Sequence, residues 1–158
     1  MTEDKAPEDH KKQILFVCTA NICRSPMAAA MFNALAEERG LAYRAESAGV
    51  AALGELGIHA GDHRARRVSE EMLEGADLVL TMGPQHVAAL RRLGAHLQGG
   101  KVYALPEYAL GASGEEGIPD PYGNTMTAYR ASVRQLLGCV EGLMERLERE
   151  ENFGGSFR

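Results

Sequence analysis

Cys18 and Arg24 are the two residues whose types and spacing point most directly to chemistry. A cysteine followed by five residues and an arginine can place a nucleophile and a cation on one tight loop. The arginine guanidinium is a planar fork of N–H donors that matches two oxygens of a tetrahedral phosphate dianion. Backbone N–H groups in such a turn also converge on an anion, and they would favour the thiolate form of the cysteine. The pair therefore predicts a phosphate-binding loop with a nucleophile at its floor.

The sequence on either side of this pair favours the functional interpretation over a buried cysteine beside a surface arginine, a spacing that also arises by chance. Residues 13–17 are a short β-rich run, apolar from Ile14 on, that is typical of a buried parallel strand, and Pro26 is typical of the first turn of a helix. Asn21 can hold a turn in the left-handed conformation. Ser25 is placed to donate to the thiolate as it leaves. The cradle would also contain Thr19, Ala20, Ile22 and Cys23.

Cys23 is a second thiol on the same loop, five residues after Cys18. On oxidation the two could form a disulfide that protects the nucleophile from irreversible over-oxidation. A buried loop residue without a redox role is the alternative. Both interpretations stay open at this point.

Asp120 is the candidate general acid. Attack on phosphorus needs a proton for the leaving group, because an alkoxide, phenolate or amide leaves poorly unaided. Asp120 lies in a Gly- and Pro-rich stretch, 106–124, which we expect to be a long functional loop. Pro119 and Pro121 restrict its backbone, and a wall that includes Tyr122 would desolvate the carboxyl and keep it protonated.

The same carboxylate, once ionised, would activate water against a phosphocysteine. This mechanism needs no metal and no cofactor. A plain turn is the alternative for the sequence Asp-Pro-Tyr-Gly at 120–123, and the presence of the cradle favours the acid.

The apolar pattern along the chain predicts alternating strands and helices. We expect strands near 13–17, 43–48, 77–82 and 101–105, and helices near 26–39, 70–75, 84–93 and from 125 to about 150. This order predicts an α/β fold, a single-domain doubly wound parallel four-stranded sheet flanked by helices, with the Cys-x5-Arg loop after the first strand. The domain would span 13–150, between flexible tails at 1–12 and 151–158.

Apolar faces should attach two of these helices to the core. In the helix at 26–39 the inward residues would be Met27, Met31, Phe32, Leu35 and Ala28. In the last helix they would be Met126, Tyr129, Val133, Leu136, Leu137, Val140, Leu143, Met144 and Leu147. Cys139, within that helix, is most simply a small core residue.

Composition limits the partners and the compartment. The chain has 158 residues, a net charge of −5 and only 6% aromatic residues, which is typical of an acidic soluble domain and lacks the basic stripe of a nucleic-acid binder. Residues 1–12 lack the apolar region of a signal peptide, and no apolar run approaches the ~18 residues of a membrane span. Three cysteines are too few for a disulfide framework, and none has zinc-site spacing. We expect a cytoplasmic protein that binds neither nucleic acid nor a membrane.

Two motifs together resemble the low-molecular-weight protein tyrosine phosphatases. They are residues 18–26, Cys-Thr-Ala-Asn-Ile-Cys-Arg-Ser-Pro, and residues 120–123, Asp-Pro-Tyr-Gly. The likeness covers nearly the whole chain and includes 47–49, 63–67, 77–82 and 101–108. It implies hydrolysis of phosphotyrosine in a protein or peptide through a phosphocysteine intermediate, with inorganic phosphate as product and inhibitor.

The resemblance also implies a role for each matching residue. Cys18 would be the nucleophile, Arg24 the phosphate clamp, Asp120 the general acid and base, and Ser25 the thiolate donor. Asn21, Ser47 and His63 match a hydrogen-bond network that holds the loop in shape. Tyr122 matches an aromatic wall of the substrate cleft.

The chain departs from the family pattern at two positions. The family usually has Gly where this chain has Ala20, and a positive φ there would cost about 1–2 kcal/mol. Many relatives also carry two aromatic residues after Asp-Pro, whereas Gly123 follows Tyr122 here. One docking ring is therefore missing.

Residues 47–50 and 107–108 resemble the bacterial branch that includes protein-arginine phosphatases, which carry Thr at the position of Ile22. A branched apolar side chain there would pack against an aromatic ring and would offer no polar group to a guanidinium. Ile22 therefore favours phosphotyrosine, and hydrolysis of phosphoarginine by the same mechanism is the alternative.

Two other classes of protein compete with this interpretation. Arsenate reductases use the same fold and loop but need further shuttle cysteines, and no cysteine lies between Cys23 and Cys139. A non-catalytic phosphoprotein-binding module needs the cradle alone. The joint presence of Cys18, Arg24 and Asp120 argues against such a module, because binding requires neither the thiol nor the acid.

Overall fold

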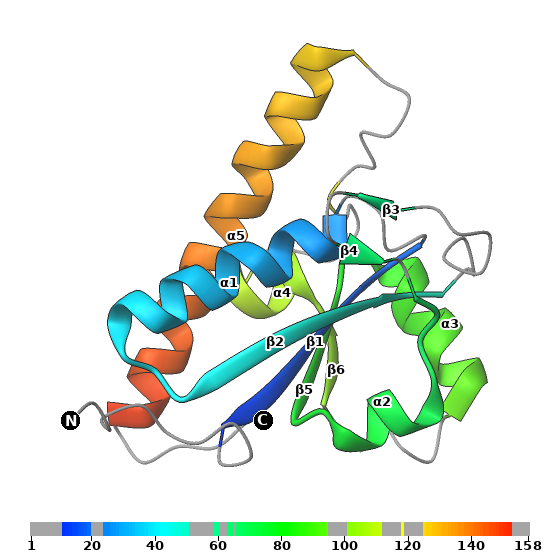
Figure 1. The fold of residues 1–158 in the computed structure, drawn as a ribbon, viewed down its shortest axis with the longest axis horizontal. Coiled ribbons are helices and arrows are strands. Elements are labelled where there is room, and N and C mark those ends of the chain that lie inside the picture. Colours follow the sequence, from blue (N-terminus) through cyan, green and yellow to red (C-terminus); the bar gives the residue numbers. More distant parts are fainter. Residues whose placement is uncertain are drawn as a thin grey trace.

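The computed structural model describes residues 11–19, 24–50, 59–60, 63–64, 66–94, 101–111, 118 and 125–152. The described chain forms a parallel β-sheet with helices on both faces (Figure 1). This confirms the doubly wound α/β architecture that the sequence predicts.

Four parallel strands make up the main sheet, in the order β2-β1-β5-β6. They are β1 (Lys12–Cys18), β2 (Tyr43–Gly49), β5 (Leu78–Thr81) and β6 (Val102–Ala104). Cys18 pairs with Gly49 on β2, and Val17 pairs with Thr81 on β5, so these three strands end at one edge of the sheet. The strand order reverses beside β1, and in open α/β sheets this switch point is where ligands bind.

The short strands β3 (His59–Ala60) and β4 (His63–Arg64) form a separate antiparallel pair. The helices are α1 (Arg24–Arg39), α2 (Glu70–Gly75), α3 (Pro84–Gly94), α4 (Leu105–Leu110) and α5 (Met126–Asn152). Ser69 caps α2, because its side chain accepts a hydrogen bond from the backbone N–H of Met72 at 3.2 Å. No described helix is long and apolar enough to cross a membrane.

Alternate side chains of β1 pack into two separate apolar cores. Ile14 and Phe16 face the layer of α1, α4 and α5, whereas Leu15 and Val17 face the layer of α2 and α3. This alternation follows from the two-residue period of a strand. Because both faces of β1 are buried, the packing on both sides fixes the position of its carboxyl end and therefore of Cys18.

Helix α4 corrects the sequence prediction. The stretch 106–124 was expected to be one long loop, yet its first residues belong to a helix that buries Leu105, Pro106 and Tyr108. Proline suits the first turn, and Gly111 ends the helix in the left-handed conformation at φ 73°. Residues 106–110 of this stretch are therefore helical rather than part of a loop.

Two helix ends also differ from expectation. Helix α1 begins at Arg24 rather than near residue 26, which places the candidate clamp in its first turn. Helix α5 continues to Asn152, beyond the expected end near 150, because its last turns consist of strong helix formers without Gly or Pro.

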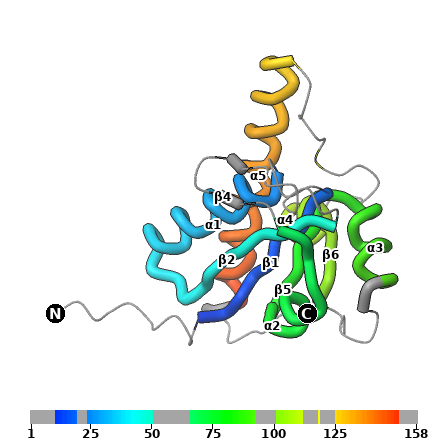
Figure 2. Tube along the Cα trace, turned by 45° about the vertical axis from the view of Figure 1, so that its right-hand side comes forward, coloured from blue at the N-terminus to red at the C-terminus, as the bar shows by residue number. Residues whose placement is uncertain are grey.

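The apolar face of α5 is only partly buried. Leu136, Cys139, Val140, Leu143, Met144 and Leu147 lie in the core, as predicted. Met126 is 63% exposed and Leu137 39% exposed, and Tyr129 is also exposed, so their predicted packing is wrong. The reason is geometric, because the N-terminal half of α5 extends away from the other described elements in both views (Figures 1 and 2).

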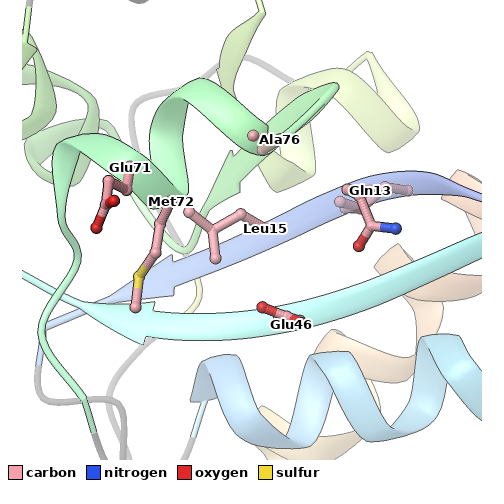
Figure 3. A pocket seen from close by; sticks show the side chains of 8 residues that line it. Gln13, Leu15, Glu46, Glu71, Met72 and Ala76 are labelled. Carbon is pink, nitrogen blue, oxygen red and sulfur yellow. The ribbon is translucent and has the colours of Figure 1, made fainter. Parts of the chain in front are cut away.

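A small cavity of about 190 Å³ lies between α2 and the first half of β1 (Figure 3). Glu71 and Met72 of α2, Leu15 of β1 and Glu46 of β2 line it. Leu15 precedes Cys18 by three residues, which is about 10 Å along a strand. This cavity is therefore separate from the candidate active site.

Candidate active site

Cys18 and Arg24 frame the candidate site. Cys18 is the last residue of β1 and is 2% exposed, and Arg24 is the first residue of α1 and is 6% exposed. The N-terminus of a 16-residue helix thus lies six residues after the candidate nucleophile in the sequence. Unsatisfied N–H groups at such a terminus, together with the helix dipole, favour an anion.

Ser25 lies directly against the thiol. Its Oγ is 3.0 Å from Cys18 Sγ, and Ser25 is fully buried. The same hydroxyl also lies within reach of the Ala48 carbonyl, at 3.4 Å. A hydroxyl has one proton to donate, and a thiolate can only accept, so ionisation of Cys18 would draw that proton to the sulfur.

Two acceptors on different segments orient the Arg24 guanidinium. Its Nη1 donates to the Ile118 carbonyl at 3.1 Å, and its Nη2 lies 3.4 Å from Thr19 Oγ1. The backbone N–H of Ile118 in turn donates to the Met82 carbonyl at 2.7 Å, just beyond β5. The guanidinium therefore connects the loop after β1 with the segment that leads toward Asp120.

Thr19 has a second partner that the sequence did not suggest. Its Oγ1 lies 2.9 Å from Nε2 of His86, a histidine in the first turn of α3 that is 1% exposed. No motif marks His86. Only the position of His86 could have indicated a role in the site, because His86 follows β5, the strand that pairs with β1 at the switch point of the sheet.

The end of β2 completes the described part of the site. Ser47 is buried there, pairs with Phe16, and accepts a hydrogen bond at its carbonyl from Arg66 Nε at 3.0 Å. The backbone N–H of Val50 donates to the Cys18 carbonyl at 3.0 Å. These contacts bring the end of β2 and the segment after β4 beside the nucleophile.

Several predicted site residues lie outside the described residues: Ala20, Asn21, Ile22, Cys23, Asp120 and Tyr122. His63 belongs to β4, and only its backbone is described. The predicted network of Asn21, Ser47 and His63 therefore stays a prediction. Within the described part of the chain, no three His, Cys, Asp or Glu side chains gather where they could hold a metal ion.

Cys139 is a thiol of a different kind. It is 1% exposed in the core, and burial raises its pKa above the usual value for a thiol. Such a cysteine stays protonated and is a poor nucleophile. Its predicted role as a small core residue is confirmed.

A buried cysteine, a serine beside it and an oriented arginine at a helix N-terminus are the features of a cysteine-dependent phosphatase. The family model for low molecular weight phosphotyrosine protein phosphatase matches residues 13–152. The chain belongs to that family.

Curated relatives in the family carry two kinds of name. The chain is 35% identical over 150 residues to a protein-arginine-phosphatase of Bacillus subtilis, covering 87% of this chain and 97% of that protein. It is 33% identical over 150 residues to a low molecular weight protein-tyrosine-phosphatase of Streptomyces coelicolor, covering 84% of this chain and 91% of that one.

The fold of the chain is also that of a solved family member. The YwlE arginine phosphatase of Geobacillus stearothermophilus superposes with a TM-score of 0.76 at 31% identity, covering 93% of this chain and 99% of that one.

Proposed function

We propose that this protein removes phosphate from phosphotyrosine in protein substrates through a phosphocysteine intermediate. The observation that carries the proposal is the 3.0 Å contact between Cys18 Sγ and Ser25 Oγ at the N-terminus of α1. A serine hydroxyl buried against a thiol stabilises the thiolate both as nucleophile and as leaving group.

In the first step the Cys18 thiolate attacks phosphorus. A sulfur–phosphorus bond forms while the bond from phosphorus to the tyrosine oxygen breaks, and Asp120 donates its proton to that oxygen. Arg24 and the amides of the loop stabilise the charge on the equatorial oxygens. The protein thus supplies a nucleophile, a proton donor and electrostatic stabilisation of the transition state.

In the second step water hydrolyses the phosphocysteine. The ionised Asp120 carboxylate takes a proton from the water, whose oxygen bonds to phosphorus while the bond to sulfur breaks. Ser25 donates a hydrogen bond to the departing thiolate. Inorganic phosphate is the product and occupies the same cradle, so it should inhibit the enzyme competitively.

The remaining predicted residues support this reaction. Asn21, Ser47 and His63 hold the loop in shape, and the amides of Thr19, Ala20, Ile22 and Cys23 face the phosphate. Ile22 and Tyr122 wall the substrate cleft. Because the mechanism needs a reduced thiol, we propose that the protein acts in the cytoplasm.

Phosphoarginine is the second candidate substrate. Its support is that relatives 35% and 31% identical to this chain are named arginine phosphatases. The support for phosphotyrosine is Ile22, which offers contact to a ring and no polar group to a guanidinium. The reaction is the same in both cases, except that Asp120 would protonate a nitrogen when phosphoarginine is cleaved.

A comparison of two matched peptides tests the proposed substrate. We expect kcat/KM for a phosphotyrosine peptide to exceed that for a phosphoarginine peptide about tenfold, a difference of about 1.4 kcal/mol. Cys18→Ser serves as the blank. A preference for phosphoarginine would place the chain with the arginine phosphatases, and the absence of both activities would contradict the proposed function.

A further inference from the structure

His86 is a buried histidine at the edge of the candidate site. It is the third residue of α3, it is 1% exposed, and its backbone N–H donates to the Gly83 carbonyl at 3.1 Å. The Thr81 hydroxyl donates to the same carbonyl at 2.8 Å and is itself buried. These two bonds shape the turn after β5 and fix the point from which the imidazole extends.

The Thr19 hydroxyl lies between His86 and Arg24. Its oxygen is 2.9 Å from His86 Nε2 and 3.4 Å from Arg24 Nη2. A guanidinium can only donate, so the hydroxyl oxygen of Thr19 accepts the hydrogen bond from Arg24 with one of its lone pairs. Nε2 either donates to that oxygen or accepts its proton, according to the tautomer, and in both cases it holds the hydroxyl in place.

We propose that His86 is a positioning residue that sets the plane of the Arg24 guanidinium through Thr19. The inference rests on the proposed function, in which Arg24 binds the transferring phosphoryl group. A planar guanidinium needs two contact points to fix its orientation. Ile118 supplies a contact at Nη1, and Thr19 supplies one at Nη2 whose position depends on how its own hydroxyl is held.

The expected consequence is kinetic rather than structural. A shift of about 1 Å in a group that stabilises the transition state can cost on the order of 100-fold in rate. Because Arg24 must match the charge that develops during transfer, the loss should appear in kcat more than in KM. A histidine that merely fills space would instead lower stability and leave the kinetics of the folded protein unchanged.

A set of four variants tests the proposal. His86→Ala should lower kcat at least about tenfold, with a small change in KM. His86→Gln should restore much of the loss, because its amide can reach the position of Nε2. Gln85→Ala is the matched control, since Gln85 is the exposed neighbour on the same helical turn.

The fourth variant, Thr19→Val, shows whether His86 acts through Thr19. If it does, adding His86→Ala to Thr19→Val should have little further effect on kcat. Full additivity of the two losses would overturn the proposal, and so would wild-type kcat in His86→Ala. The thermal unfolding midpoints of all variants show whether a lower kcat comes from loss of folded protein. If His86→Ala does not fold, the kcat values of His86→Gln and Thr19→Val still test the proposal.

Binding of vanadate, whose five-coordinate bound form resembles the transition state of phosphoryl transfer, separates this inference from the proposed function. If the wild-type protein binds vanadate and hydrolyses nothing, the proposed function fails. In that protein a weaker affinity for vanadate in His86→Ala would still support the positioning of Arg24, and an unchanged affinity would contradict it.

Discussion

Arg24 Nη1 donates a hydrogen bond to the carbonyl of Ile118 across 94 residues of sequence, at 3.1 Å. Ile118 is 2% exposed and lies two residues before Asp120. The residue proposed to clamp phosphate is therefore tied to the backbone that carries the proposed general acid. Positioning of the clamp and of the acid should depend on one another.

Arg24→Lys tests whether the planar guanidinium of Arg24 is needed for catalysis. A lysine keeps the positive charge but loses the planar fork, so it cannot serve Ile118, Thr19 and a phosphate together. We expect kcat/KM to fall on the order of 10²–10³-fold, as when a donor to a developing oxyanion is removed. Steady-state kinetics at saturating and limiting substrate measure the change, and a loss of less than about threefold would show that the fork is dispensable.

Ser25→Ala should slow the breakdown of the phosphocysteine. A hydrogen bond to a charged group contributes about 1.5–3 kcal/mol, so the step in which the thiolate leaves should slow about 10- to 100-fold. Stopped-flow measurement with an activated aryl phosphate should then show a burst of phenol release followed by slow turnover.

Ser69→Ala is the control for this experiment. It removes the cap of α2 and should cost about 1 kcal/mol of stability without a change in burst kinetics. A Ser25→Ala enzyme with the kinetics of the control would exclude the proposed role of the hydroxyl.

Tyr108 should make the fold sensitive to alkaline pH. Its burial raises the pKa from 10.0 to about 12, with a smaller opposing effect of Arg146, whose guanidinium lies 3.7 Å from the ring centroid. The folded pKa is higher than the unfolded one, so the stabilisation is complete below pH 10 and is lost between pH 10 and about 12. The free energy of unfolding should fall there by about 3 kcal/mol.

Tyr108→Phe should remove this part of the alkaline loss. The Tyr108 hydroxyl is buried and finds no hydrogen-bond partner among the described residues, so its removal should be neutral or stabilising near pH 7. Urea unfolding of both proteins at pH 7 and across pH 10–12 measures the difference. If the free energy of unfolding falls by the same amount in both proteins between pH 10 and 12, groups other than Tyr108 cause the alkaline loss of stability.

Asn33 should protect the edge strand β2. Its side-chain amide donates to the Ala45 carbonyl at 3.0 Å and accepts from the Ala45 N–H at 2.8 Å. Unpaired groups on an edge strand invite pairing with another chain. Asn33→Ala should therefore cost about 1–3 kcal/mol and increase self-association while leaving kcat/KM unchanged.

Asn33→Asp is the matched variant, because it keeps the acceptor for the Ala45 N–H and loses the donor. Its stability should lie between those of the wild type and Asn33→Ala. Urea unfolding and sedimentation velocity measure both effects. Equal stability of the three proteins would show that the amide contributes nothing at this edge.

The sequence predicted the sheet because its signals are local. The apolar run that became β1 and the proline in the first turn of α1 mark their elements without reference to the rest of the chain. Helix α4 was missed because Gly and Pro are frequent in the stretch 106–124. Leu105 and Tyr108 are buried by contacts that no local pattern reveals. Exposure of Met126 was missed because periodicity gives the face of a helix and not the point where its neighbours end.

The same distinction between local sequence signals and contacts of distant residues applies to the candidate site. Cys18, Ser25 and Arg24 lie on one loop and helix start, so their proximity follows from the motif. His86 lies 67 residues from Thr19, and their contact depends on the order of strands in the sheet. A lone histidine in a first helical turn carries no signal of such a contact.

Trapping of the phosphoenzyme tests the central claim most directly. The wild-type protein is mixed with a phosphotyrosine peptide, quenched within one turnover, digested and analysed by mass spectrometry. We expect one phosphoryl group on Cys18, with a higher yield in Ser25→Ala, where breakdown of the intermediate is slower. Turnover without phosphorylation of Cys18, or undiminished turnover in Cys18→Ser, would contradict the account.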